Sequence, residues 1–177
     1  IINPTAMWRK EIGEHYGLYD NGDFPEDYEM WLRWLEKGIK IGKVNQTILK
    51  WMDSDTRLTR THPIYSDKAF YRIKTHYLTH WLQQNNPFHP HISVWGASRI
   101  SRKRAQMLEQ YGIIIDNYID IKTTRQTDKE VVHYTNLPVP GNILVLVYVR
   151  QWYAKEEIKK FFNKRNYREG KDYLFVS

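Results

Sequence analysis

The chain has 177 residues, of which 41% are hydrophobic and 27% are charged, and this composition excludes a disordered tail. It contains no cysteine, which excludes a disulfide framework, a catalytic thiolate and cysteine-ligated zinc. The net charge of +7 is uneven, because residues 1–88 carry 12 basic and 11 acidic side chains, whereas residues 89–177 carry 15 and 9. A basic chain rich in aromatics suggests nucleic acid as a partner, but most aromatics recur at core spacing, so we expect no nucleic acid.

The first half of the chain has an irregular pattern with one clear helix start. Asp23 is predicted to be the N-cap of a helix that begins at Pro25, with Glu26 three residues after the cap. Apolar spacing and breaker residues predict a strand at Thr5–Arg9, helices at Lys10–Tyr16, Pro25–Lys37 and Ser66–Gln84, and strands at Ile39–Val44 and Thr47–Trp51.

The second half alternates between strand and helix patterns. A polar segment with two prolines, residues 83–90, is the expected boundary between domains at 1–86 and 87–177. The pattern predicts strands at His91–Trp95, Ile113–Ile119, Val131–Tyr134, Ile143–Val149 and Asp172–Val176, and helices at Ser101–Tyr111 and Ala154–Asn166, the former capped by Gly112. This order is typical of a small α/β domain with a parallel sheet.

The helix predicted at Pro25–Lys37 carries a carboxylate on its apolar face. Helical spacing places Asp27 on one inward face, together with Met30, Trp31, Trp34 and Leu35. Glu29 and Arg33 are four residues apart on another face, as in an ordinary surface pair. An ionised acid near a helix N-terminus suits a general base or an electrostatic anchor. The alternative is that Asp27 only caps its helix or pairs with a buried arginine.

Two runs of sequence carry a resemblance to a known family. The runs are 24–33, followed by Gly38–Ile41, and 49–66. They resemble the carboxyl-terminal part of glycosyltransferase family 2 catalytic domains, which have the GT-A fold, and the second run is similar to one bacterial branch. The resemblance covers residues 1–84. It implies an inverting transfer of a sugar from a nucleotide-sugar to an acceptor hydroxyl, in polysaccharide or glycan biosynthesis.

The resemblance implies roles for individual residues. Asp27 matches the catalytic base, and Glu26 orients it or touches the acceptor, while Trp31 is assigned to substrate binding. Arg57 and Arg60 lie where the family closes over the donor, and arginine holds phosphate oxygens well; the alternative for both is a solvated loop. His62 is assigned as a metal or phosphate ligand, although a loop histidine is more often neither.

One part of the family pattern has no match in this chain. The family carries its nucleotide-binding strands and an Asp-x-Asp metal motif upstream, whereas Asp53-Ser54-Asp55 follows the Glu-Asp helix and is interpreted as a loop turn. The chain opens with Ile1, without a signal peptide or an initiator methionine, so we expect a truncated enzyme that is inactive in isolation. The implied metal, Mn²⁺ or Mg²⁺, would be bound mainly by the upstream half.

The implied partners are a nucleotide-sugar donor and a glycan or lipid-linked acceptor. The implied location is cytoplasmic, at the inner face of the membrane. Peripheral membrane contact and a homo-oligomer are left open as further partners. The basic helix predicted at Ala154–Asn166 is most simply a solvated surface, and an anionic membrane is its alternative partner.

The second domain carries a degraded dinucleotide fingerprint. Gly96 follows a predicted strand and opens a helix, but Ser98 and Ser101 stand where the other two glycines belong, and Asp120 ends the next strand. Gly96, Ser98, Arg99 and Asp120 are therefore the candidates for holding a nucleotide or another anion. The alternatives are a Rossmann-like domain without a cofactor and, for the whole chain, a non-catalytic nucleotide- or anion-binding module. This region is similar to a carboxyl-terminal extension of the same bacterial branch.

Overall fold

The computed structural model describes residues 3–50, 52, 54–124 and 126–177. The chain divides into two compact units, Ile1–Leu78 and Thr79–Ser177, and each is described by itself. The division falls within helix α4 (Asp67–Asn85), ahead of the polar segment predicted as the boundary. No helix in the described part of the chain is both long and apolar enough to cross a membrane.

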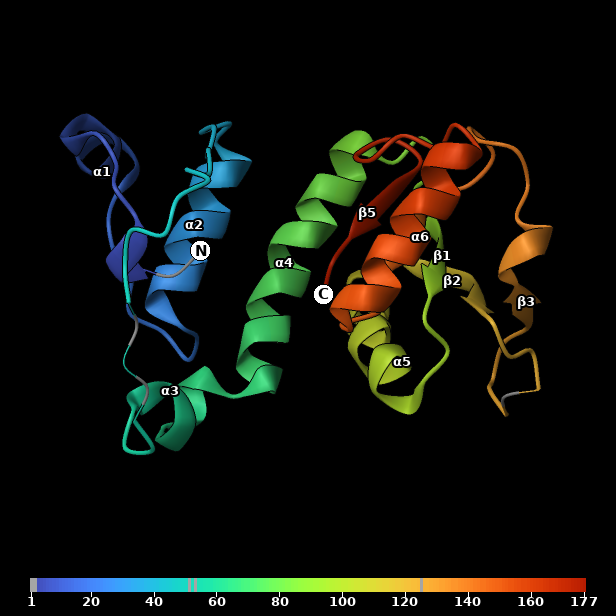
Figure 1. The fold of residues 1–177 in the computed structure, drawn as a ribbon, viewed down its shortest axis with the longest axis horizontal. Helices are drawn as coiled ribbons and strands as arrows, with labels where there is room; N and C mark the ends of the chain where they lie inside the picture. The colour runs from blue at the N-terminus through green and yellow to red at the C-terminus, as the bar shows by residue number, and fades with distance from the viewer. Residues whose placement is uncertain (1–2, 51, 53, 125) are drawn as a thin grey trace. The chain divides into compact units, whose positions relative to one another are not determined.

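The first unit is built from helices and connecting loops (Figure 1). Its elements are η1 (Asn3–Thr5), α1 (Lys10–Tyr16), α2 (Glu26–Glu36), α3 (Leu58–Thr61), η2 (Pro63–Tyr65) and the start of α4. Its core is aromatic, because Trp31 and Trp34 of α2 meet Trp8 edge to face at 5.4 and 5.6 Å. The predicted helix at residues 10–16 is confirmed, and α2 and α4 begin and end within a residue of their predicted bounds.

The three strands predicted for the first unit are wrong. Residues 6–9 and 39–50 form no strand, and residues 3–5 are a 3-10 helix. Trp51, the last residue of one predicted strand, lies outside the described residues. The side chains of residues 40–50 are all exposed, so their alternating pattern has no apolar face to bury. Strand pairs without a packed face are not stable in water, and the described residues of the first unit form no sheet for them to join.

Two details of α2 also differ from the prediction. Asp23 is not the N-cap; Pro25 occupies that position without a side-chain cap, and the backbone carbonyl of Asp23 accepts a hydrogen bond from Arg72 of α4. Leu35 is 49% exposed rather than inward, because the buried stripe of α2 runs along Met30, Trp31 and Trp34.

The second unit is a five-stranded parallel sheet with the strand order β3-β2-β1-β4-β5 (Figure 1). Its strands are β1 (His91–Trp95), β2 (Ile114–Asp120), β3 (Val131–His133), β4 (Val145–Val147) and β5 (Tyr173–Phe175). All pairs are parallel, which confirms the predicted α/β class and is consistent with a Rossmann-like fold. The order reverses between β1 and β4, the point where ligands bind in open sheets of this type.

Helices complete the second unit and its core. They are α5 (Arg99–Ala105), η3 (Gln106–Tyr111), η4 (Tyr134–Asn136) and α6 (Trp152–Lys164). The predicted helix at 101–111 is thus an α-helix that continues as a 3-10 helix, and Gly112 caps it in the left-handed conformation, as expected. Ile158 and Phe162 of α6 pack against Trp95, Ile119 and Tyr173 of the sheet.

Candidate functional site

The first turn of α2 carries the Glu26-Asp27 pair, and Tyr65 holds Glu26 in place. The Tyr65 hydroxyl lies 3.0 Å from both carboxylate oxygens of Glu26 and donates to them. Tyr65 closes η2, which directly follows α3. This contact ties the loop that contains Arg57, Arg60 and His62 to the start of α2. No pattern in the sequence singled out Tyr65 as a partner of Glu26.

Asp27 is half-buried next to Glu26, and its environment favours the protonated acid. Burial raises the pKa of Asp27 above its usual value, and the neighbouring charge of Glu26 adds to the rise. The backbone N–H of Tyr28 opposes the shift. Burial therefore outweighs the helix-end stabilisation of the ionised form that was expected. A carboxylate with a raised pKa accepts a proton more readily once it is ionised.

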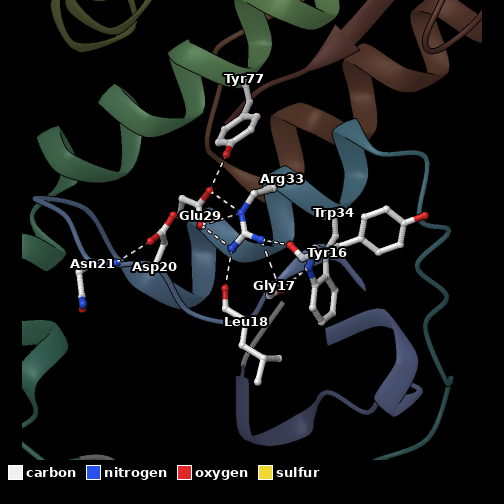
Figure 2. Close-up of polar contacts among 9 residues, drawn as sticks. All are labelled: Tyr16, Gly17, Leu18, Asp20, Asn21, Glu29, Arg33, Trp34 and Tyr77. Atoms are coloured by element: carbon white, nitrogen blue, oxygen red, sulfur yellow. Dashed lines mark hydrogen bonds and ion pairs between the residues drawn. The ribbon is translucent and has the colours of Figure 1, made fainter. Parts of the chain in front are cut away.

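Glu29 and Arg33 form a buried network, so their prediction as an ordinary surface pair is wrong (Figure 2). Glu29 is 4% exposed, and its carboxylate accepts hydrogen bonds from Arg33 Nε at 3.0 Å and from the Tyr77 hydroxyl of α4. Arg33 also donates to the backbone carbonyls of residues 16–18. The carboxylate raises the pKa of Arg33, and burial with Glu29 raises that of Tyr77. The network joins α2, α4 and the loop after α1. Glu29 lies in α2 two residues after Asp27, so the network is next to the turn that carries the Glu26-Asp27 pair.

The two predicted donor-binding arginines lie around α3. Arg57 is half-buried at the N-cap position of α3, and Arg60 pairs with Asp55 at 2.7 Å. The Arg60 side chain is 47% exposed and Asp55 is 99% exposed, so this pair adds little stability. The structure places both residues on the segment that Tyr65 anchors to Glu26. Their contact with a donor phosphate remains a prediction.

His62 lies between α3 and η2. Its Nδ1 accepts a hydrogen bond from the backbone N–H of Ile64 at 3.3 Å, which caps η2. Among the described residues, no group of three or more histidine and acidic side chains is arranged to hold a metal ion. The metal or phosphate role of His62 therefore remains a prediction, as does the Mn²⁺ or Mg²⁺ that the resemblance implies.

Trp31 lies in the aromatic core of the first unit. It is 6% exposed and packs edge to face against Trp8 and Trp34. Its indole Nε1 is buried and meets no hydrogen-bond acceptor within the described parts of the chain. The substrate role of Trp31 remains a prediction, and its packing role is evident.

In the second unit, the Gly96 turn is closed by its own side chains. Ser98 caps α5 by accepting from the Ser101 N–H at 3.2 Å, and its hydroxyl donates to Ser101 Oγ at 3.0 Å. Ser101 Oγ in turn donates to the backbone carbonyl of Tyr148, the residue after β4, at 3.1 Å. The serines in the fingerprint's glycine positions therefore join the loops after β1 and β4. Arg99 is exposed at the same turn.

Asp120 supports this turn from the end of β2. It is 9% exposed, and its carboxylate accepts from the backbone N–H groups of Ala97 at 2.9 Å and Ile121 at 2.8 Å. In dinucleotide-binding domains the corresponding acid holds a ribose hydroxyl. Here both oxygens are engaged by backbone. The structure thus brings Gly96, Ser98 and Asp120 together, and the hydrogen bonds of Ser98 and Asp120 stabilise the turn itself.

Replacing Gly96 with alanine is expected to destabilise the second unit by about 1–3 kcal/mol. Gly96 has a φ of 122°, and an added Cβ would lie 3.1 Å from Ser101 Oγ and 3.2 Å from its Cβ. Thermal unfolding of the variant measures this. Gly170→Ala is the control for backbone strain alone, because φ is also positive there but no atom lies within 4 Å of the added Cβ. Equal losses in the two variants would mean that the contact with Ser101 has no effect.

No family model, curated protein or solved structure matches this chain. The fold therefore defines a class only: an α/β protein whose parallel sheet is consistent with a Rossmann-like fold.

Proposed function

We propose that residues 1–86 are the carboxyl-terminal part of a glycosyltransferase catalytic domain, and that Asp27 is its general base. The protein would transfer a sugar from a nucleotide-sugar to an acceptor hydroxyl with inversion, in polysaccharide or glycan biosynthesis. The observation that carries the proposal is the half-buried Asp27 with its raised pKa, beside a Glu26 that Tyr65 holds in place. The family resemblance of runs 24–33 and 49–66 supports it.

The chemistry follows from the two carboxylates. Inverting displacement at the anomeric carbon requires a base on the face opposite the leaving group, to take the proton of the acceptor hydroxyl. Asp27 has the raised pKa that suits this step, whereas Glu26 accepts from Tyr65 and orients the turn. Arg57 and Arg60 would neutralise the leaving nucleoside diphosphate. A divalent metal, Mn²⁺ or Mg²⁺, would supply further charge neutralisation from the upstream half.

Asp27→Asn tests the base in the full-length polypeptide that contains this chain. With a panel of nucleotide-sugars, the variant should lose about 100-fold or more of its transfer rate, because loss of a general base typically costs that much. The matched control is Asp23→Asn, an exposed acid outside α2, which should keep its rate. A wild-type rate in Asp27→Asn would refute the base assignment, and no transfer by the wild type with any donor would refute the enzyme class.

The pH profile gives a second readout of the same base. The ionised form of Asp27 is the active one, so transfer by the wild type should fall as the pH drops through the raised pKa of this carboxyl. The fall should begin at a higher pH than an ordinary aspartate would produce. Asp27→Asn should lack this acid limb in any residual activity.

A further inference from the structure

A cavity lies at the amino ends of three strands in the second unit. It is lined by the start of β1, by Asp116 of β2 and by residues 142–144, which directly precede β4. Its volume of about 310 Å³ is within the range of small-molecule sites. The Gly96 turn follows the other end of β1, so this cavity is separate from the degraded dinucleotide fingerprint.

Three polar side chains of the lining keep hydrogen-bonding capacity for a ligand. His91 Nδ1 donates to Asp116 Oδ1 at 2.7 Å, and this contact orients the imidazole. Asn142 donates through Nδ2 to the carbonyl of Val139 at 3.3 Å. Among the described residues, no group is hydrogen-bonded to His91 Nε2, Asp116 Oδ2 or Asn142 Oδ1. The His91 and Asp116 side chains are 51% and 42% exposed, so a ligand can reach them.

The bottom of the cavity is apolar and is held in shape by the sheet. Ile92 and Leu144 line it although they are 1% and 0% exposed, and Phe88 beside them is half-buried. The Ser93 N–H donates to the Leu144 carbonyl at 2.9 Å, which joins the two strands there. An apolar lining with a few polar groups that fix orientation is typical of a preformed small-molecule site.

The charge of the lining disfavours an anionic ligand. The described residues that line the cavity include the carboxylate of Asp116 and no lysine or arginine, so a phosphate would meet a like charge without a cation to offset it. A neutral ligand with several hydroxyl groups suits the polar atoms, because hydroxyls donate to carboxylate and amide oxygens and exchange hydrogen bonds with an imidazole nitrogen. A sugar ring has these hydroxyls and also a C–H face that can pack on Phe88.

We propose that this cavity binds a single neutral pyranose ring. Asp116 Oδ2 and Asn142 Oδ1 accept from its hydroxyl groups, His91 Nε2 forms a further hydrogen bond, and the apolar bottom contacts its C–H face. The site lies wholly in the second unit and goes beyond the sugar transfer proposed for residues 1–86. It is tested by binding alone, so its result does not depend on whether that transfer occurs.

Saturation-transfer NMR with the full chain tests the site. Glucose, galactose, mannose and N-acetylglucosamine are offered both free and as methyl glycosides, and at least one should bind. Binding of a methyl glycoside indicates the end of a glycan as the ligand, whereas binding of the free sugar alone indicates a monosaccharide. The imidazole signals of His91 should shift on titration with the bound sugar, whereas those of His133, which lies in β3, should not.

Two matched pairs of variants locate the contacts. Asp116→Ala should weaken binding by about tenfold, the usual effect of losing a hydrogen bond to a charged acceptor, and its control is Asp128→Ala, an exposed acid after β2. Asn142→Ala should also weaken binding, whereas Asn163→Ala, an exposed asparagine of α6, should not. The His91–Asp116 pair is half-exposed, so its loss should leave the fold intact, which circular dichroism checks.

Three results would overturn the proposal. The first is that none of the sugars binds in either form. The second is that the cavity variants bind as well as their controls do. The third is binding of methylamine that Asp116→Ala abolishes, without binding of any sugar, which would replace the sugar by a cationic ligand.

Discussion

Glu29→Ala is expected to lower the free energy of unfolding of the first unit by about 2–4 kcal/mol. The substitution leaves the Arg33 guanidinium and the Tyr77 hydroxyl without the buried carboxylate that accepts from both. Breaking a buried ion pair from one side costs more than the pair contributes, because the remaining charge stays desolvated. Urea unfolding followed by tryptophan fluorescence, together with hydrogen exchange of the α2 amides, measures the loss.

Glu14→Ala is the matched control, because Glu14 pairs with Lys10 at the same four-residue spacing on α1. That pair is 2.9 Å apart, but its side chains are 59% and 84% exposed, so the variant should cost less than about 1 kcal/mol. Tyr77→Phe, which removes only the hydroxyl, should cost about 1 kcal/mol. A similar loss for Glu29→Ala and Glu14→Ala would show that burial adds nothing to the network.

The Glu29 network shows why local sequence patterns mispredicted part of the first unit. A glutamate and an arginine four residues apart are typical of an exposed helix face, and nothing within α2 distinguishes the two cases. Here contacts from outside α2 determine that the pair is buried. They come from the Tyr77 hydroxyl and from the backbone carbonyls of residues 16–18. Backbone acceptors leave no trace in the residue pattern, and Tyr77 lies 48 residues after Glu29 in the chain.

The strand predictions were confirmed in the second unit and wrong in the first, for a similar reason. In the second unit each predicted strand is an apolar run next to a turn residue such as Gly96 or Asp120, and all five exist because each has a neighbour in one sheet. In the first unit, residues 39–50 have comparable alternation, but the part of that unit that the structure describes forms no sheet for them to join. Strand formation depends on distant partners, which a window of sequence does not contain.

The candidate sites were predicted unevenly as well. The Gly96 turn and Asp120 were found because a strand, a glycine and a later acid keep a fixed order, and the structure does bring them together. Tyr65 was missed because its partner Glu26 is remote in sequence. The start of the last helix was also missed, because it was expected at Ala154, whereas α6 begins at Trp152 and leaves Trp152 and Tyr153 exposed.

Phe162→Ala is expected to destabilise the second unit by about 3–5 kcal/mol, which is the usual cost of emptying a buried aromatic site. The Phe162 ring is fully buried and stacks on Tyr173 of β5, with centroids 4.1 Å apart and planes 14° apart. It also meets Trp95 of β1 edge to face at 5.1 Å. One side chain thus fastens α6 to two strands, and these contacts are lost together. Thermal and urea unfolding measure the change.

Two other aromatic residues of α6 serve as controls for this prediction. Phe161 is only half-buried against Trp95 and Tyr134, so Phe161→Ala should cost clearly less than Phe162→Ala. Trp152→Ala should leave stability almost unchanged, because three quarters of that side chain is already exposed. Equal losses in all three variants would mean that α6 is held by general hydrophobic contact rather than by the Phe162 stack.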